Sequence, residues 1–553
     1  MANGAAVCLV LSSSVIFCVL ASPACISNLT MSLPQKTDIL VIGSGNAGLS
    51  AALTAAQTNP TLRITVIDKS PVSWAGGNSY FTAGAFRTTH NGLNDLLPLV
   101  NNTDATQASR IDIPIYTEQD FTADLQRMTG HRTDLALSSA LVRDSRVAVG
   151  WLAANGIRFQ LSFNRQAYEV NGRIKFWGGL ALKTQDGGKG LVEDELRAVR
   201  KAGVDVFFDT AATALVTDPT SGAVVGVEVV NKDSDGAHNR ITIDVGAVIL
   251  AAGGFEANPQ LRAQWLGPGW DSARVRGTPY NTGEMLQIAQ RDVSAKRAGD
   301  WSGCHSVAWD ADAPADSGNR EVSNEFTKSG YPLGIMVNRD GKRFVDEGFD
   351  MRNYTYAMVG RRVLQQPGQV AFQVWDARTV AWLREEEYRD EVVRRIEGAS
   401  LEELAGKCAE VGLVDPERFV QSIKEYNASV EDGDGQKRWD PAVKDGLATK
   451  GLTIPKSNWA LPIDKPPFLA VKVTAGITFT FGGLAVNPET AAVISEASDE
   501  VPGLYCVGEM LGGIFYDNYP GGSGLTSGTV FGRRAGRAAA ELVGKSGWEE
   551  WKT

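Results

Sequence analysis

The chain has 553 residues, of which 43% are hydrophobic and 21% are charged. This length exceeds what one hydrophobic core supports, so two or three domains are expected, and the composition is that of a globular protein. With 54 basic and 64 acidic residues the net charge is −10 and no dense basic run occurs, which argues against a nucleic-acid partner.

The first 30 residues leave two alternatives open. Residues 5–21 are mostly apolar and Ser22, Pro23 and Ala24 resemble a small-residue cleavage site, as in a signal peptide or anchor. No Lys or Arg precedes Met31, however, and Met31 would be a natural start before the first strand. We expect the secretory pathway or membrane association if the leader is real, and a cytoplasmic protein if translation starts at Met31.

The six cysteines form no recognisable cluster. Three lie in the first 30 residues, and Cys304, Cys408 and Cys506 are scattered without a C-x-x-C pair. This pattern supports neither a metal, iron–sulfur or haem site nor a disulfide framework, so no metal ligands are expected.

Residues 38–50 contain a glycine motif in the context it requires. The apolar run Ile39–Ile42 predicts a strand, and Gly43, Gly45 and Gly48 follow as G-x-G-x-x-G before a pattern typical of a helix. Gly43 permits the tight turn, Gly45 lets a pyrophosphate approach, and Gly48 lets the helix pack on the strand. The free N–H groups at the helix start favour an anion.

A second strand, residues 63–67, ends at Asp68, 25 positions after Gly43. Its carboxylate is placed to accept hydrogen bonds from an adenosine ribose. Strand, helix, strand and acid together predict a dinucleotide site rather than a glycine-rich turn of an ordinary α/β domain.

The rest of the chain reads as a domain with a second one inserted into it. Periodicity and turn residues predict helices at 119–155, 376–392, 400–412 and 525–543 and a meander of strands at 206–209, 214–217, 224–230 and 241–249. We expect a leader (1–30), a first nucleotide-binding part (37–284), an inserted capping or substrate domain (285–470) and a second nucleotide-binding part (471–545).

Four blocks carry a resemblance to a known family. They are residues 43–48, 76–84, 250–256 and 503–509 followed by 521–527. In this order they resemble the FAD-dependent fumarate reductase/succinate dehydrogenase flavoprotein superfamily over about residues 37–545, and the blocks 299–309, 343–356, 476–483 and 518–528 are similar to tricarballylate dehydrogenase. The resemblance implies an α/β fold with a Rossmann-type, glutathione-reductase-like FAD-binding domain and an inserted α+β capping domain. It also implies hydride exchange between flavin N5 and a C–C bond.

The resemblance implies non-covalent FAD, because Ser73, Trp74 and Ala75 stand where some relatives carry an attachment histidine. The cofactor-binding residues that it implies are Gly43, Gly45, Asn46, Ala47, Gly48, Asp68, Lys69, Gly76, Gly77, Asn78, Ser79, Ala83, Gly84, Ala214, Ala252, Gly253, Gly508, Glu509, Gly524, Leu525 and Thr526.

Two departures from the family concern the substrate. Phe479 takes the place of a histidine, and Tyr519 the place of an arginine, that bind dicarboxylate in fumarate reductases. Fumarate is therefore not the expected substrate. The pattern Tyr519-Pro-Gly-Gly also resembles 3-ketosteroid Δ1-dehydrogenases, in which a tyrosine polarises a ketone, so Tyr519 is expected to contact substrate.

Arg352 matches the family position that shuttles protons. Arginine is a poor base at its ordinary pKa, so this role needs Glu347 or Asp346 as a relay in a dry site. A capping-domain ion pair is the alternative. His305, in a polar segment, suits an orienting or acid role, with a structural histidine as the alternative.

Two further residues are candidates for substrate binding. Arg87 could clamp a carboxylate through its bidentate fork, with a solvated loop arginine as the alternative. Thr480 lies beside the position of the missing histidine.

Three functions stay open. The first is an FAD-dependent dehydrogenase or reductase of the CH–CH type that acts on a small acid or ketone. The second is a ketosteroid-like or secondary-metabolite desaturase or oxidase, and the third is a flavin-binding subunit without its own turnover. The expected partners are a small-molecule substrate and an external acceptor, which is O₂, a quinone or a carrier.

Overall fold

The structure is a computed structural model that describes residues 32–232, 238–315, 319–430 and 439–545. The predicted leader therefore lies outside the described residues. The chain divides into a unit up to Pro34 and a compact unit from Gln35 onward, and only the second is described below. Among the described helices, none has the length and apolar character needed to cross a membrane.

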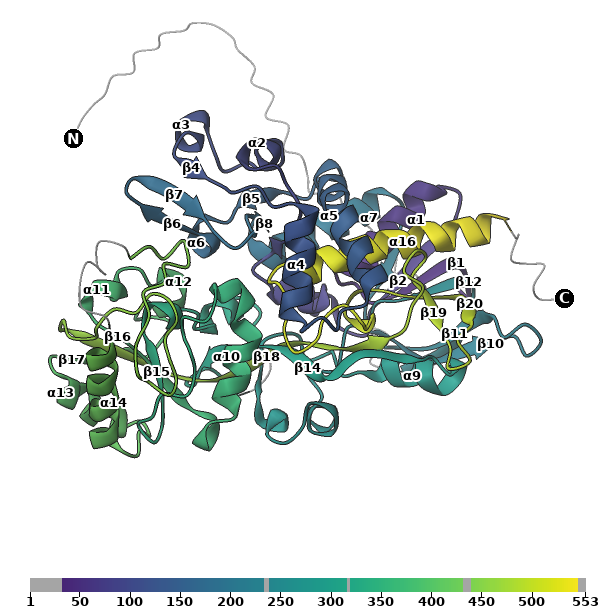
Figure 1. The fold of residues 1–553 in the computed structure, drawn as a ribbon. Helices are drawn as coiled ribbons and strands as arrows, with labels where there is room; N and C mark the ends of the chain where they lie inside the picture. The colour runs from purple at the N-terminus through teal and green to yellow at the C-terminus, as the bar shows by residue number, and fades with distance from the viewer. Residues whose placement is uncertain (1–31, 233–237, 316–318, 431–438, 546–553) are drawn as a thin grey trace, which may run out of the picture. The chain divides into compact units, whose positions relative to one another are not determined.

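An eight-stranded sheet forms the centre of the nucleotide-binding part (Figure 1). Strand β1 (Lys36–Ile42) pairs in parallel with β2 (Ile64–Ile67) on one side and with β12 (His238–Leu250) on the other. The apolar run Ile39–Ile42 is buried, as a strand covered on both faces requires. The remaining strands of this sheet are β9 (Asp205–Phe207), β10 (Thr210–Thr217), β11 (Val224–Lys232), β19 (Ala492–Ile494) and β20 (Glu500–Cys506).

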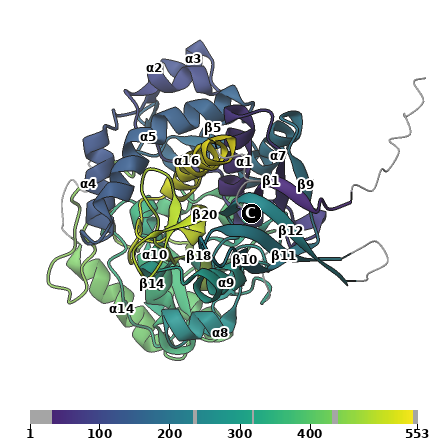
Figure 2. The same cartoon turned by 90° about the vertical axis from the view of Figure 1, so that its right-hand side faces the viewer.

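Two helices from opposite ends of the chain pack on each other beside this sheet. Helix α1 (Asn46–Thr58) and helix α16 (Ser523–Lys545) lie side by side in both views (Figures 1 and 2). A Cβ at Gly536 would lie 2.2 Å from the Ala51 carbonyl oxygen, and one at Gly532 would lie 2.5 Å from that of Ala47. The glycines of α16 are therefore needed for the two backbones to approach so closely.

The predicted meander is confirmed for three of its four strands. β10, β11 and β12 are antiparallel neighbours, but β9 pairs in parallel with β2 at the opposite edge. The prediction for the first strand was wrong because helix α7 (Gly187–Lys201) precedes β9, and a helical crossover returns the chain parallel to an earlier strand.

A second, six-stranded sheet spans residues 274 to 484. Its longest strand, β18 (Phe468–Leu484), pairs with β13 (Arg274–Val275), β14 (Arg297–Asp310), β16 (Ala371–Trp375) and β17 (Ile396–Gly398). β15 (Ile335–Asn338) completes it beside β16. β14 runs antiparallel to β18 and places His305 opposite Phe479. The division at residues 285–470 stays a prediction.

The predicted helix at 376–392 is two short helices, α11 (Ala377–Val380) and α12 (Glu385–Tyr388). The chain turns between them because Arg384 is directed inward, where it pairs with Glu387 and contacts the Ser329 hydroxyl. The region 119–155 likewise forms two helices, α4 (Glu118–Met128) and α5 (Leu135–Ala154), since Gly130 and His131 adopt positive φ between them.

The remaining described helices are α2 (Leu93–Leu96), α3 (Ala105–Ala108), α6 (Phe163–Gln166), α8 (Pro259–Leu261), α9 (Glu284–Val293), α10 (Tyr356–Leu364), α13 (Leu401–Ala409) and α14 (Pro416–Ser429). Two three-stranded sheets consist of β3 (Ala85–Phe86), β8 (Leu182–Thr184) and β5 (Phe159–Leu161), and of β4 (Ile111–Asp112), β7 (Arg173–Phe176) and β6 (Ala167–Val170). Helices α13 and α14 cover the second sheet through a buried apolar cluster that includes Leu404, Phe419 and Phe372.

Candidate active site

One large cavity joins the glycine motifs to the second sheet. Its volume is about 800 Å³, and its lining extends from Gly45 at the start of α1 to His305 on β14 and Phe479 on β18. This volume lies in the upper part of the roughly 300–1,000 Å³ typical of ligand pockets. The cavity is therefore large enough to hold a ligand that reaches from one motif to the other.

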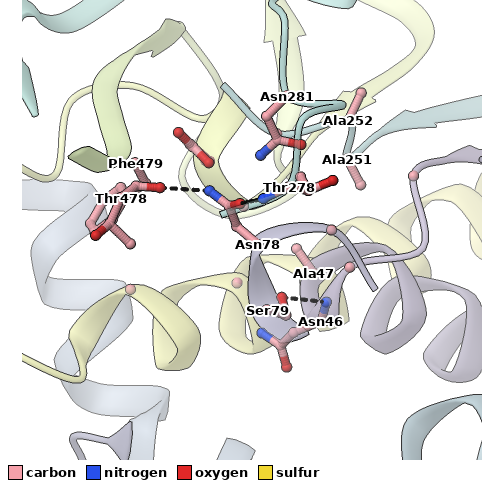
Figure 3. Close-up of a pocket in the computed structure, with 18 of the residues that line it drawn as sticks. Asn46, Ala47, Asn78, Ser79, Ala251, Ala252, Thr278, Asn281, Thr478 and Phe479 are labelled. Atoms are coloured by element: carbon pink, nitrogen blue, oxygen red, sulfur yellow. Dashed lines mark hydrogen bonds between the residues drawn. The ribbon is translucent and has the colours of Figure 1, made fainter. Parts of the chain in front are cut away.

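The start of α1 faces this cavity without a side-chain cap. Gly45 occupies the cap position and makes no side-chain hydrogen bond, and the Asn46 amide donates to the Ser79 hydroxyl at 3.0 Å (Figure 3). Gly45, Asn46 and Ala47 all line the cavity. Ser79 thus takes the Asn46 amide, and the N–H groups that follow it in the first turn form a site for an anion such as a phosphate.

The other two glycines of the motif serve the packing of the backbone. Gly43 has φ +114°, and a Cβ there would lie 2.3 Å from the Ala251 carbonyl oxygen. A Cβ at Gly48 would lie 2.1 Å from the Gly43 carbonyl oxygen, so Gly48 lets the helix approach the turn. Gly48 does not line the cavity, in keeping with the packing role expected for it.

Asp68 lies at the end of β2 and lines the cavity. One carboxylate oxygen accepts from the Ser44 amide at 2.9 Å and from the Ser44 hydroxyl at 2.7 Å, and the other accepts from Ser70. The neighbouring Lys69 also lines the cavity, but its ammonium group is bound to Glu284 at 2.7 Å.

Asn78 connects three segments in the middle of the cavity wall (Figure 3). Its side-chain amide donates to the Thr478 carbonyl at 2.6 Å and to Glu256, while its oxygen accepts from the Thr278 amide at 2.9 Å. A ligand in the cavity is thus bordered by strand β18 on one side and by the 276–281 loop on another.

Two buried carboxyl groups, Glu256 and Glu509, lie next to each other at this wall. Glu256 accepts hydrogen bonds from Asn78 and Asn281, and Glu509 accepts from the Thr480 amide at 2.6 Å and from its hydroxyl at 3.0 Å. The second oxygen of Glu256 has no partner unless one carboxyl of the pair carries a proton. Burial, followed by the neighbouring carboxyl of Glu509, raises the pKa of Glu256 well above its ordinary value.

This pair predicts a pH dependence of stability. The folded-state pKa of Glu256 is raised, so the protonated carboxyl contributes to the free energy of unfolding. That contribution is fully present below the ordinary pKa of 4.5 and is lost as the pH rises through the folded-state pKa. In Glu256→Gln the amide replaces the protonated carboxyl. Above the ordinary pKa of Glu, each further pH unit should therefore increase the free energy of unfolding of Glu256→Gln relative to that of the wild type. The increase should be at most about 1.4 kcal/mol per pH unit.

Chemical denaturation at pH values from 5 to 8 measures this difference. Glu193→Gln, at an exposed position of α7, is the control and should follow the wild type at every pH. Parallel profiles for Glu256→Gln and the wild type would show that the pair does not hold a proton.

At the other end of the cavity six aromatic residues form a cluster, which we call the aromatic box. Tyr519 packs edge-to-face against His305 at 4.9 Å and against Phe479 at 5.1 Å between ring centroids. The members of the box, all of which line the cavity, are His305, Tyr356, Phe479, Phe481, Phe515 and Tyr519.

Two polar side-chain atoms of the box lack a hydrogen-bond partner among the described residues. The Tyr519 hydroxyl has no hydrogen-bond partner among the described residues, and His305 Nδ1 is buried without one. Burial, and then the charge of Arg276, lower the pKa of His305 well below its ordinary value. Burial raises the pKa of Tyr519. His305 is therefore neutral and Tyr519 is protonated at neutral pH.

Arg87 is fully buried and does not line the cavity. It donates to the Gly521 carbonyl at 2.8 Å and to the Tyr116 hydroxyl at 2.9 Å, and it lies 3.6 Å from the Asp124 carboxylate. Burial disfavours its charge, but Tyr116, Tyr354 and Asp124 outweigh this and raise its pKa. Arg87 thus holds the glycine loop before α16. It was expected to contact a substrate carboxylate, but its side chain binds protein groups and does not reach the cavity lining.

Replacement of this buried arginine should destabilise the protein. In Arg87→Met the Gly521 carbonyl and the Asp124 carboxylate lose a charged partner, and the free energy of unfolding should fall by about 3–5 kcal/mol. Arg110→Met, which removes an exposed ion pair with Glu169, should cost less than about 1 kcal/mol. Urea denaturation of both variants measures the contrast, and equal losses would contradict the assigned role of Arg87.

Arg352 and Glu347 are also outside the cavity. Arg352 donates to the Arg165 carbonyl and its guanidinium lies 4.9 Å from the Trp177 ring, beside a separate small pocket. Glu347 is bound to Arg343 and to the Met336 amide at 2.7 Å, and neither contact joins it to Arg352 as a relay would. The proton-shuttle role of Arg352 stays a prediction.

The structure brings most of the predicted cofactor residues to the cavity, but not all. Gly48, Gly76, Gly84, Ala214 and Thr526 do not line it. Gly76 and Gly84 are glycines because a Cβ would lie 2.5 Å from Val192 or 2.1 Å from Thr184. The residues that line it are Gly43, Gly45, Asn46, Ala47, Asp68, Lys69, Gly77, Asn78, Ser79, Ala83, Ala252, Gly253, Gly508, Glu509, Gly524 and Leu525. Their contacts with a cofactor stay predictions.

Sequence reasoning missed cavity-lining arginines, among them Arg165 and Arg276, and the aromatic residues Tyr356, Phe481 and Phe515. Phe481 had a signal, because it is two residues from Phe479 on a strand and so shares its face. Neither arginine belongs to a motif. Thr480 lines the cavity as expected, although its hydroxyl is engaged by Glu509.

The comparisons with known proteins agree with this geometry. The model of the FAD binding domain family matches residues 38–525. A probable fumarate reductase of Shewanella frigidimarina is 25% identical over 507 residues, covering 92% of this chain and 75% of the relative. A 4-oxocyclohex-2-ene-1-carboxylate 5-dehydrogenase of Sinomonas cyclohexanicum is 25% identical over 591 residues, covering 92% of this chain and 94% of the relative.

A solved structure extends the likeness to the fold. The 3-ketosteroid delta1-dehydrogenase of Sterolibacterium denitrificans, in complex with 1,4-androstadiene-3,17-dione, superposes with a TM-score of 0.67 at 20% identity and covers 92% of this chain and all of that one. The expected fold, a Rossmann-type FAD-binding domain with a capping domain, is confirmed. The narrower likeness to tricarballylate dehydrogenase stays a prediction. The chain belongs to the FAD binding domain family and is an FAD-dependent oxidoreductase.

Proposed function

We propose that this enzyme adds or removes hydrogen across a C–C bond that lies beside a carbonyl or carboxylate group in a ring-bearing substrate. The observation that carries the proposal is the continuity of one cavity from the uncapped start of α1 to the aromatic box. Bound FAD supplies the hydride exchange at its N5 position. The ring of the substrate is recognised by the box, whose faces and edges accept aromatic or alicyclic groups.

The residues of the cavity fit an FAD. Several residues that line it carry a side-chain polar atom without a protein partner, among them Gln166, Thr478 and Thr327, and such unpartnered atoms are uncommon in a wall that is packed only against protein. The start of α1 would hold the diphosphate and Asp68 the adenosine ribose. Gly524 and Leu525, at the start of α16, would place the positive end of that helix at the flavin ring.

Tyr519 and His305 are the groups that we assign to the reaction. The free hydroxyl of Tyr519 would donate a hydrogen bond to the substrate's carbonyl or carboxylate oxygen and stabilise the charge that develops there. The neutral imidazole of His305, 4.9 Å away between ring centroids, would hold or accept a proton at the carbon beside that group.

Two features support a ring-bearing substrate over a small dicarboxylate. Phe479 and Tyr519, where fumarate reductases carry a histidine and an arginine, are packed into the aromatic box and leave no room for cationic groups at these positions. The Sinomonas relative and the ketosteroid structure are both named for ring-containing substrates. A ketosteroid-like desaturase is the second candidate, and the free Tyr519 hydroxyl is the observation that favours it.

We also propose that electrons leave or enter through a separate acceptor or donor, which is O₂, a quinone or a carrier. Cys304, Cys408 and Cys506 are buried and unpaired, and no group of His, Cys, Asp and Glu among the described residues is arranged to hold a metal ion. We therefore assign the electron acceptor or donor to a group outside the described part of the chain.

Anaerobic titration of the purified yellow protein tests this function. We expect saturated ring-bearing acids or ketones to bleach the flavin absorbance, or their unsaturated counterparts to restore it after reduction. If neither class changes the flavin absorbance in either direction while FAD stays bound, the chain is a flavin-binding subunit without its own turnover.

A further inference from the structure

Arg276 is a buried arginine that lines the cavity without a carboxylate partner. It follows β13, where its backbone amide donates to the Ile477 carbonyl at 2.8 Å, and its side chain is held by the side-chain oxygen of Asn324. Its exposed fraction is 7%, and its Nε atom has no hydrogen-bond partner. In the part of the chain that the structure describes, no Asp or Glu forms an ion pair with it.

Three other arginines that are buried or half-buried have carboxylate partners, whereas the buried Arg262 and Arg352 donate hydrogen bonds only to backbone carbonyl oxygens among the described residues. Arg165 lies 2.6 Å from Glu386, Arg384 lies 2.9 Å from Glu387, and Arg343 pairs with Glu347. Burial, and then the nearby charge of Arg165, lower the pKa of Arg276 to about 10, so it is still charged at neutral pH. A buried charge with one neutral partner is unfavourable, and a ligand that brings an anion removes the penalty.

The charge of Arg276 is felt inside the aromatic box. After burial, it is the second cause of the lowered pKa of His305. The pKa of Tyr356 is raised by burial, and the charge of Arg276 opposes part of that rise. All three side chains line the same cavity. Arg165 lines this part of the cavity too, but its guanidinium is committed to Glu386 and Glu387. Of these two described arginines, Arg276 is therefore the one that remains available to a ligand lying against the aromatic rings.

We propose that Arg276 binds the carboxylate of the substrate, which makes the substrate a ring-bearing carboxylic acid rather than a neutral ketone. This inference rests on the proposed function, because it assumes that the aromatic box holds the substrate. Among the described residues no carboxylate binds the guanidinium of Arg276, and a planar guanidinium can bind a carboxylate with two hydrogen bonds. Phe479 and Tyr519 carry no positive charge to bind an anion, and in this proposal Arg276 supplies that charge.

The test uses two probes that lack a C–C bond to desaturate, phenylacetate and phenylacetamide. Their dissociation constants are measured with the FAD-bound oxidised enzyme from the perturbation of the flavin spectrum. The wild type should bind the acid at least about tenfold more tightly than the amide. In Arg276→Met the affinity for the acid should fall by at least about 30-fold while that for the amide is unchanged, and Arg276→Lys should restore part of the loss.

A second readout separates a binding role from a structural one. Without probe, Arg276→Met should unfold at the same or a higher temperature than the wild type, because an unpaired buried charge has been removed. Arg165→Met, which breaks a paired arginine, is the control and should unfold at a lower temperature. A midpoint for Arg276→Met that falls as far as the control's, or an unchanged affinity for the acid, would overturn the inference.

Failure of this inference and failure of the proposed function give different results. Equal binding of acid and amide by the wild type, or binding of neither, together with bleaching by ring-bearing ketones would overturn the carboxylate site and keep the proposed function. Strong, Arg276-dependent binding of phenylacetate with no flavin response to any saturated or unsaturated compound would support the anion site and reject the reaction.

Discussion

Gly43→Ala should yield a protein that no longer retains FAD. Gly43 has φ +114°, outside the region that residues with a side chain adopt, which costs about 1–3 kcal/mol. The added Cβ would also lie 2.3 Å from the carbonyl oxygen of Ala251, and relief of this overlap costs about 1–3 kcal/mol more. Since both terms act on the turn between β1 and α1, the start of α1 moves from the cavity. The ratio of flavin absorbance to protein absorbance after gel filtration measures the loss.

Gly203→Ala is the matched control for this variant. Gly203 has φ +81°, but a Cβ there meets nothing within 4 Å, so only the backbone term of about 1–2 kcal/mol applies. This variant should elute with its FAD and with a slightly lower melting temperature. If Gly43→Ala retained FAD as fully as Gly203→Ala, the glycine motif would not form the nucleotide site.

Tyr519→Phe should lower kcat by about 10²–10³-fold while FAD binding stays intact. The hydroxyl of Tyr519 has no hydrogen-bond partner among the described residues. In the proposed function it donates to the oxygen where charge develops, and loss of one such donor costs about 3–4 kcal/mol. The phenyl ring preserves the packing against His305 and Phe479. Stopped-flow measurement of flavin bleaching, with whichever compound the anaerobic titration identifies, gives the rate.

The neighbouring Tyr516 provides the control for that measurement. Its ring packs against Arg132 and it does not line the cavity, so Tyr516→Phe should keep the wild-type rate. A rate for Tyr519→Phe within a factor of about three of the wild type would mean that the hydroxyl does not assist the reaction.

The nucleotide end of the cavity could be predicted from sequence because its parts are local. The turn at Gly43, the uncapped helix start at Gly45 and the acid after β2 are fixed by neighbours in the chain, and all three are where the motif places them. The short helices near residue 384 could not be predicted, because the inward turn of Arg384 depends on partners at Glu387 and Ser329 that periodicity does not show.

The substrate end was only partly predictable, because it is assembled by pairing between distant strands. His305 and Phe479 meet because β14 and β18 are antiparallel neighbours, and Arg276 enters the cavity because β13 pairs with β18. Arg87 looked like a clamp for a ligand. In the structure it binds the protein instead, because its guanidinium donates to the Gly521 carbonyl in the loop before α16. A sequence motif identifies the residue type at a position. Whether that side chain binds other protein groups or remains available to a ligand depends on contacts that form only in the fold.

The central proposal is that one cavity holds FAD at its glycine end and a ring-bearing acid at its aromatic end. Anaerobic reoxidation of the chemically reduced enzyme tests this proposal most directly. The flavin absorbance is followed after mixing with trans-cinnamate or with fumarate at equal concentration. We expect cinnamate to restore the oxidised spectrum at least about tenfold faster than fumarate, because the box binds the ring and neither Phe479 nor Tyr519 is a cation. Faster reoxidation by fumarate would contradict it.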